Sequence, residues 1–308
     1  MIKWKSVKLA ERLRKISQNF NMIKPTTISE KLLFSTVRIA VQLSSGEEAT
    51  GTGFFFNFLV DEQTHIPAII TNKHVVAGAV RGSFQLHELD KTIEQPQPSG
   101  DFIPVDLDDF ENLWISHPDK DVDLCAMLFQ PLRSEAEIQG KSIFNCAIDN
   151  SSILSKADLE ELSAAEEVLM IGYPNGLWDE VNNLPLIRRG TTATHPAVDF
   201  QGRSTTVIDA ACFPGSSGSP VLIVNEGGTY STKSGAFTGY TRVVLLGVLF
   251  SGPVITAQGE IVSETIPTSQ QSISLTRLMI HLGYIVQAKE IKVLGEHIKQ
   301  ILQASGNL

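Results

Sequence analysis

Short apolar segments separated by polar turns run through most of the chain, and amphipathic helical periodicity appears at its two ends. Segments rich in β-branched and aromatic residues, bounded by turn residues, predict β-strands. Between positions 34 and 131 such segments include residues 36–43, 53–56, 68–71 and 123–129. About six strands of this kind are enough to close a small barrel. We therefore predict a first β-barrel over residues 25–131.

The strand pattern is lost over residues 132–162, which carry many acidic residues and serines, and it returns afterwards. We predict that residues 132–162 link two barrels and hold some helix near positions 156–162. Apolar segments at 168–172, 185–190, 205–210, 220–224 and 242–250 then predict a second β-barrel over residues 163–287. The fold class expected from this pattern is all-β.

Each end of the chain predicts an amphipathic helix. Residues 1–24 place apolar side chains on one face and basic ones on another, namely Leu9, Leu13, Ile16 and Phe20 against Lys5, Lys8, Arg12 and Lys15. A basic helix can bind a membrane surface or an acidic partner, but packing against its own barrel explains the same pattern, and we expect no membrane contact. Residues 288–308 form the second helix, with apolar residues at 291, 294, 298, 301 and 302.

The charge and the cysteines of the chain exclude several classes of protein. With 25 basic and 34 acidic residues in 308, the net charge is -9, which argues against broad nucleic-acid binding. The three cysteines, Cys125, Cys146 and Cys212, are odd in number and lack the spacing of metal ligands, so we expect neither a disulfide framework nor a zinc site. No apolar run reaches the length of a membrane-spanning helix. Together these features predict a cytoplasmic protein.

Candidate chemistry lies in residues 209–220, where Ser217 stands on a turn between Gly215 and Gly218. A serine hydroxyl is a weak nucleophile, so it needs a base and a group that orients the base. Both have candidates upstream, because His74 ends one apolar run and Asp123 begins another. The three residues follow one another along the chain in the order His, Asp, Ser.

Three aspartates compete for the role of the orienting acid: Asp119, Asp121 and Asp123. The acid should lie where a loop enters a buried strand, so it should directly precede the apolar run. This argument selects Asp123 and leaves Asp121, its outward-facing neighbour, as the alternative.

Several segments, taken in order, resemble the trypsin-like serine peptidases with the chymotrypsin fold, and among these the Deg/HtrA-type protease domain: residues 51–54, 70–76, 123–126, 171–177, 189–193 and 209–220. The resemblance implies two six-stranded antiparallel β-barrels and a protease without a metal or an organic cofactor. It also implies that His74 is the base, Asp123 orients it, Ser217 attacks the peptide bond, and the backbone N–H groups of Gly215 and Ser217 bind the oxyanion.

This sequence departs from the family's pattern at two points. Ser219 stands where a glycine is usual, which could adjust packing beneath the turn. Deg/HtrA proteins usually append a peptide-binding PDZ domain, which needs on the order of 80 residues, and we expect no such domain because only 22 residues follow Val286.

The resemblance also indicates the pocket for the side chain before the scissile bond. Its floor lies six positions before the nucleophile, at Ala211, and its wall comes from Phe250, Ser251 and Gly252. With no charge on the floor, we expect a preference for small to medium apolar side chains, because burying an unpaired charge is costly. Asp209 is the main threat to this expectation, since strand alternation puts it on the same face as Ala211.

Two functions of different classes follow. The preferred one is a serine endopeptidase acting on a protein or peptide substrate. The alternative is a non-catalytic or latent trypsin-like module, which acts as a binding scaffold or as a protease switched on by an activating protein partner. Such a partner could touch the basic N-terminal helix or the Gly-, Ser- and Thr-rich segment 225–241.

Overall fold

The structure is a computed structural model that describes residues 22–61, 63–227, 230–231, 237–238, 241–261, 272–279 and 281–306. Residues 1–21, and with them nearly all of the predicted basic helix 1–24, lie outside the described residues. Within the described part, no helix is both long enough and apolar enough to cross a membrane.

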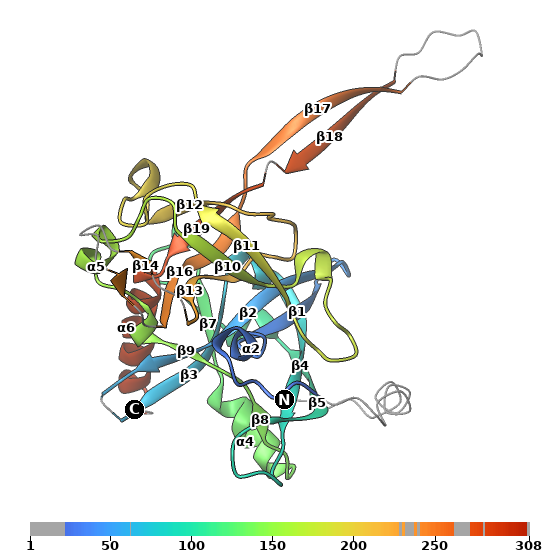
Figure 1. Ribbon diagram of the computed structural model, residues 1–308. Coiled ribbons are helices and arrows are strands. Elements are labelled where there is room, and N and C mark those ends of the chain that lie inside the picture. The colour runs from blue at the N-terminus through green and yellow to red at the C-terminus, as the bar shows by residue number, and fades with distance from the viewer. Residues whose placement is uncertain are drawn as a thin grey trace.

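The first half of the chain forms a nine-stranded sheet with the strand order β5-β4-β1-β2-β3-β7-β6, to which β8 adds on β4 and β9 on β2 (Figure 1). The strands are β1 Thr36–Leu43, β2 Glu48–Leu59, β3 His65–Thr71, β4 Ala79–Leu89, β5 Pro98–Asp108, β6 Ile115–Ser116, β7 Cys125–Leu128, β8 Ile143–Phe144 and β9 Ile148–Asp149. Six strands were predicted for this half, and the structure has seven strands between residues 36 and 128 together with the short strands β8 and β9 from residues 132–162. The chain after β7 also forms the helices α4 Gln130–Ile138 and α5 Lys156–Glu160.

The second half forms a closed barrel of six strands in the order β10-β11-β12-β19-β16-β13. Its strands are β10 Glu167–Gly172, β11 Leu186–Thr192, β12 Thr205–Asp209, β13 Pro220–Asn225, β16 Arg242–Ser251 and β19 Leu282–Gln287. Two hairpins stand outside the barrel, β14 Tyr230–Ser231 with β15 Phe237–Thr238, and β17 Val254–Ile261 with β18 Ser272–Met279. The β17–β18 ribbon projects away from the body (Figure 1). The all-β prediction is confirmed, and this barrel has the expected six strands.

Strand β2 joins the cores of the two halves because its side chains alternate between its faces. Phe55 points into the core of the first sheet, where it packs with Ile39 and Ile69. Phe56 and its neighbours two residues away, Phe54 and Phe58, face a different core, which also contains barrel residues Leu222, Leu245 and Val248. All four phenylalanines are buried, so β2 is apolar on both faces and lies between two packed layers.

The C-terminal helix α6, Lys289–Ala304, covers the core shared by the two halves. Ile291, Leu294 and Ile298 are fully buried on one face of the helix, as its predicted apolar stripe requires. Gly295 lies so close to the ring of Phe58 that a Cβ atom there would come within 2.5 Å of it. The helix therefore packs directly on β2.

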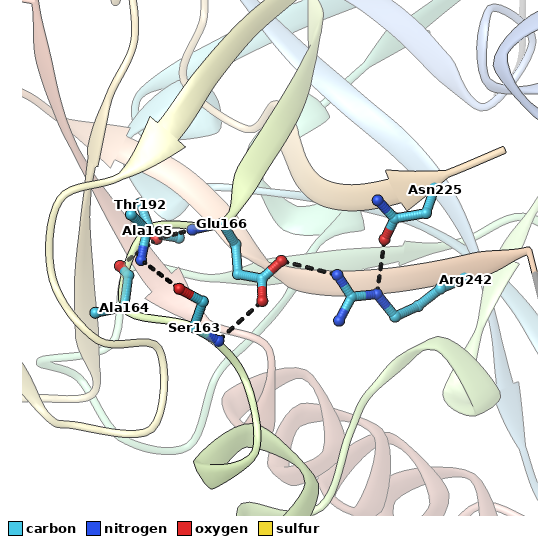
Figure 2. A network of polar contacts seen from close by, with 7 residues as sticks. All are labelled: Ser163, Ala164, Ala165, Glu166, Thr192, Asn225 and Arg242. Carbon is cyan, nitrogen blue, oxygen red and sulfur yellow. Dashed lines mark hydrogen bonds and ion pairs between the residues drawn. The ribbon is translucent and has the colours of Figure 1, made fainter. Parts of the chain in front are cut away.

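A network of polar side chains lies at one end of the barrel, near the start of β10 (Figure 2). The Glu166 carboxylate accepts hydrogen bonds from the Ser163 N–H at 2.9 Å and from Arg242 Nη2 at 2.8 Å. Arg242 Nε donates to Asn225 Oδ1 at 2.8 Å, and the Glu166 N–H donates to Thr192 Oγ1 at 2.9 Å. The network thus connects β10, β11, β13 and β16 through side chains.

Three further helices are short. They are α2 Ile28–Leu32, which begins at a capping box formed by Thr27 and Glu30, α3 Lys73–Val76, and the 3₁₀ turn Pro174–Gly176. Other 3₁₀ turns are Phe110–Leu113, Asn150–Ser152 and Phe200–Gly202. Of these, α3 and Pro174–Gly176 lie beside the candidate site.

Candidate active site

His74 and Asp123 meet because they follow and precede two paired strands. Strand β3 ends at Thr71, which pairs with Cys125 at the start of β7. Three residues after Thr71 the chain is in α3, and His74 points back to Asp123 at the entry of β7. The distance between His74 Nδ1 and Asp123 Oδ2 is 2.5 Å, and the His74 N–H donates to Asp123 Oδ1 at 3.2 Å.

Asn72 fixes the backbone of the acid, a role that sequence reasoning missed. Its side chain is fully buried, and Nδ2 donates to the Asp123 carbonyl at 2.7 Å. Next to it, Lys73 Nζ donates to the Asp119 carbonyl at 2.8 Å. The only sequence signal was an asparagine between a buried strand and a histidine, which is also an ordinary helix-capping position.

The neighbouring aspartates have other partners. The Asp121 side chain is exposed, and its N–H donates to Asp119 Oδ1 at 2.9 Å within the loop. Of the aspartates considered from the sequence, the structure thus places Asp123 at the His74 ring.

The turn that carries Ser217 is pinned between the two halves of the molecule. The Thr52 N–H of β2 donates to the Ser217 carbonyl at 2.8 Å, and the Gly218 N–H donates to the Leu249 carbonyl of β16 at 2.8 Å. Gly218 has a φ of 87°, in the left-handed region, and a Cβ atom there would overlap the Thr52 carbonyl oxygen. Glycine is required at this position both for its backbone conformation and for the close approach.

Two backbone donors beside Ser217 have no acceptor within the described part of the chain, namely the N–H groups of Gly215 and Ser217. The alternate N–H groups are satisfied: Ser216 donates to Phe213 O at 3.1 Å and Ser219 donates to Ser216 O at 3.0 Å. Gly215 adopts a φ of 81°. Since backbone N–H groups are strong donors that are normally paired when not in water, two free ones on a turn can accommodate an oxygen with negative charge.

The segment from Tyr173 to Gly176 lies against the other side of this turn. The Asn175 N–H donates to the Pro214 carbonyl at 2.5 Å, and a Cβ atom on Gly215 would lie 2.7 Å from the Tyr173 carbonyl oxygen. Tyr173 itself is buried, its hydroxyl donates to Thr36 O at 3.4 Å, and burial raises the pKa of its phenol. The segment therefore restricts the conformation that Gly215 can adopt.

Ser217 and His74 lie on opposite halves, and no hydrogen bond joins their side chains. The His74 side chain is 47% exposed, so its ring is open to solvent on the side away from Asp123. Catalytic hydrogen bonds are often long in proteins without substrate and tighten when it binds.

The residues expected to form the substrate pocket lie at or just beyond the ends of two strands of the barrel, β12 and β16. Ala211 follows β12, and Phe250 and Ser251 end β16, with β19 between these two strands. The Phe250 ring is half-buried and lies 6.5 Å from the ring of Tyr284, while Gly252 is half-buried just beyond the strand. The Asp209 side chain is exposed.

Arg188 on β11 also reaches this region, and sequence reasoning missed it. Its Nη1 donates to the Ala211 carbonyl, and its Nη2 donates to Ser216 Oγ at 2.7 Å. Burial lowers the pKa of this guanidinium, and the nearby Cys212 acts in the opposite direction. The sequence offered only two adjacent arginines before Gly190, with no sign of which one points inward.

Comparison with known proteins gives one family and several distant structures. The family model described as "Trypsin-like peptidase domain" matches residues 51–229. No curated protein sequence matches the chain.

Three of the similar solved structures share between 13% and 14% sequence identity with the chain. The active form of the Rv3671c protease from M. tuberculosis is 14% identical with a TM-score of 0.41, and the match covers 89% of this chain and 88% of that one. The HtrA-type protease AlgW with a tripeptide is 14% identical with a TM-score of 0.43, covering 89% and 62%. A serine endoprotease from Yersinia pestis is 13% identical with a TM-score of 0.42, covering 92% and 68%.

Proposed function

Because this chain belongs to the trypsin-like peptidase family and is therefore a serine protease, we propose that it is an endopeptidase that forms an acyl-enzyme on Ser217. The observation that carries the proposal is the His74–Asp123 contact of 2.5 Å together with the N–H groups of Gly215 and Ser217, which bond to no acceptor among the described residues. A base, its orienting acid and a site for the oxyanion are the parts that this chemistry needs.

In the proposed reaction, Ser217 Oγ attacks the carbonyl carbon of the peptide bond while His74 Nε2 takes the hydroxyl proton. Asp123 accepts a hydrogen bond from Nδ1–H, which keeps the proton off Nε2 before the attack and stabilises the imidazolium after it. His74 then gives the proton to the leaving amine, and the peptide's new N-terminus departs. Water, activated by the same histidine, hydrolyses the ester and releases Ser217.

The N–H groups of Gly215 and Ser217 bind the oxygen of the tetrahedral intermediate in this proposal. Each such donor contributes about 3 to 4 kcal/mol of transition-state stabilisation in comparable enzymes. Both groups belong to a turn whose neighbouring N–H groups are already bonded, so they need no rearrangement to accept a ligand.

We further propose that Ala211, Phe250, Ser251 and Gly252 form a pocket that favours small to medium apolar side chains before the scissile bond. A basic side chain is disfavoured because the Arg188 guanidinium is bonded to the Ala211 carbonyl at the pocket floor, where it would repel a second cation. Cleavage sites in a digest of denatured proteome would test this. Val, Ala or Leu should dominate, whereas Arg or Lys would refute the pocket and point to Asp209.

A latent form of the same enzyme is the second candidate, and the missing hydrogen bond between His74 and Ser217 favours it. In that case a protein partner would bring the His74 and Ser217 side chains into hydrogen-bond contact. Reaction of Ser217 with an active-site probe would then appear only after the partner is added.

The direct experiment is reaction of the purified protein with a fluorophosphonate probe, which requires an activated serine and an oxyanion site. We expect labelling at Ser217 that Ser217→Ala abolishes and His74→Ala strongly weakens. Ser219→Ala is the matched control, because the Ser219 hydroxyl is buried two residues from Ser217 and should not react. Labelling at another residue that persists in the Ser217 and His74 variants would refute the proposed triad.

Several expectations from the sequence stay predictions. They are the division at residues 24, 131, 162 and 287, the cytoplasmic location, the independence from cofactors, the lack of nucleic-acid and membrane partners, and the activating protein. The three cysteines are free thiols, which is compatible with a reducing compartment.

A further inference from the structure

The loop between Ala211 and Ser216 leads from strand β12 to the nucleophile, and it pairs with no strand among the residues that the structure describes. The residue before the loop, Ala210, makes the last hydrogen bond that continues the strand pairing: its N–H donates to the His281 carbonyl at 2.9 Å. Beyond that, Thr52 Oγ1 donates to the Gly215 carbonyl at 3.0 Å, and the Asn175 backbone N–H donates to the Pro214 carbonyl. The direction of the Gly215 and Ser217 N–H groups therefore depends on groups from other elements.

Arg188 connects both ends of this loop with one rigid group. Its two terminal nitrogens donate to the Ala211 carbonyl at the start and to Ser216 Oγ at the end. Ser216 is fully buried and directly precedes the nucleophile, so its hydroxyl cannot turn to water instead. A planar guanidinium fixes the separation and the angle of two acceptors, which a flexible ammonium does not.

The electrostatics of Arg188 indicate that this contact is more than ordinary packing. Both acceptors are neutral, and no carboxylate of the described residues forms an ion pair with the group. Its Nε is buried and has no partner within the described part of the chain. Burying a cation among neutral groups destabilises the fold unless something is gained elsewhere, so a hydrophobic residue would serve this position better if only packing mattered.

The adjacent residue provides a built-in comparison. Arg189 is the next residue on β11, and because side chains alternate along a strand it points to the opposite face, where it is exposed. The two arginines share charge, strand and local sequence. They differ in that only Arg188 contacts the nucleophile loop.

We propose that Arg188 is a positioning residue that holds the loop 211–216 in the conformation in which the Gly215 and Ser217 N–H groups converge on one oxyanion. The inference rests on the proposed function of Ser217. Without the two bonds, the loop is free to rotate its peptide planes, and a misplacement of about 1 Å at such donors can lower the rate about 10²-fold.

The test compares Arg188→Gln, Arg188→Lys and the control Arg189→Gln in three measurements. These are kcat and KM on a peptide ester, the affinity of a peptidyl trifluoromethyl ketone that forms a tetrahedral adduct with an active serine, and the melting temperature. We expect kcat of Arg188→Gln to fall about 10²-fold with KM nearly constant, since the lost interaction acts on the transition state. Ketone affinity should fall in proportion to kcat/KM.

Arg188→Lys keeps the charge but not the two-point geometry, so it should recover only part of the lost rate. Arg189→Gln should match the wild type in all three measurements. If Arg188→Gln does not fold, Arg188→Lys alone decides: a folded Lys variant with a lowered kcat and a lowered ketone affinity supports the proposal.

Two results would overturn it in distinguishable ways. Wild-type kcat and ketone affinity in a folded Arg188→Lys or Arg188→Gln variant would refute the role of Arg188 and leave the function of Ser217 intact. A wild-type protein that neither turns over ester nor binds the ketone would refute the proposed function, and the role of Arg188 with it.

Discussion

The two halves of the molecule hold their parts of the site by different means. In the nine-stranded sheet, His74 and Asp123 touch directly, side chain to side chain, at the ends of adjacent strands. In the closed barrel, Ser217 lies on a loop whose conformation depends on positive φ angles and on contacts from elements far away in sequence. Direct pairs can be disrupted by changing either partner, whereas the loop is disrupted by changes that touch neither Ser217 nor its donors.

The difference follows from topology. β3 and β7 are paired neighbours, so strand register alone brings the base to its acid. The nucleophile loop instead sits where the barrel meets the sheet, bonded to Thr52 on one side and to Leu249 on the other. Alignment of the two parts of the site therefore depends on how the halves pack against each other, along β2 and under α6.

The largest expected effect disrupts the direct pair. Asp123→Asn should lower kcat/KM about 10⁴-fold, as in the best-studied triad, because an amide can stabilise the wrong tautomer of His74. Peptide ester hydrolysis measures it. Asp121→Asn, in the same loop with an exposed side chain, should stay within a few-fold of the wild type. Should the two variants exchange their effects, the assignment of the acid would be wrong by two residues.

The second-largest effect is expected from a substitution that disrupts the loop without removing a side chain. In Gly215→Ala the new Cβ would meet the Tyr173 carbonyl oxygen at 2.7 Å, and the φ of 81° is strained for alanine. The peptide plane should rotate and displace one oxyanion donor, which lowers kcat about 10²- to 10³-fold. Gly46→Ala is the control, since Gly46 has a φ of 87° and open space around it. Equal kcat values in the two variants would contradict the role of Gly215.

Sequence reasoning predicted most of the architecture and the candidate triad because strand segments and the motifs around the triad residues can each be identified from a few consecutive residues. Strand β1 partly alternates between buried and less buried positions, and β16 is a continuous apolar run, and both signals are visible within one segment. The two-residue strands β8 and β9 are too short to show a period, so residues 132–162 read as a linker although these strands pair with the first sheet. Pairing over a long sequence separation leaves no local signal.

The supporting residues of the site were missed for the same reason. Asn72 bonds to a partner 51 residues away, and Arg188 bonds to partners 23 and 28 residues away. The residues next to them in the sequence do not indicate these partners. His117 is also buried, and its Nε2 lies 3.3 Å from Glu290 Oε2 on α6. It ties the C-terminal helix to the loop that holds the aspartates, which only the folded chain reveals.

A stability prediction compares ion pairs in the two halves. Glu166→Gln removes the carboxylate partner of Arg242 in the barrel, where the two side chains are only 12% and 14% exposed. We expect a loss of about 2 kcal/mol in the free energy of unfolding, measured by urea denaturation. Asp108→Asn breaks the exposed pair with Arg81 in the sheet and should change it by less than about 0.5 kcal/mol. A smaller loss in the barrel than in the sheet would contradict this comparison.

The smallest effect concerns a contact between the halves that lies outside the triad. His87 on β4 is buried, and its Nε2 donates to the carbonyl of Asn183 in the β10–β11 connection at 3.1 Å. Burial lowers the pKa of His87 from 6.5 to about 4, with the Asn183 hydrogen bond opposing the shift. Between these two values the unfolded chain binds a proton that the folded chain does not, so stability falls as the pH falls.

From pH 7.5 to 5.5 this histidine should remove about 1.3 kcal/mol of unfolding free energy. Measured by urea denaturation, the unfolding free energy of His87→Gln should fall between these two pH values by about 1.3 kcal/mol less than that of the wild type. His65→Gln, at an exposed position of the same sheet, should show the same fall as the wild type. An unchanged slope in the His87 variant would mean that this ring takes up its proton equally in both states.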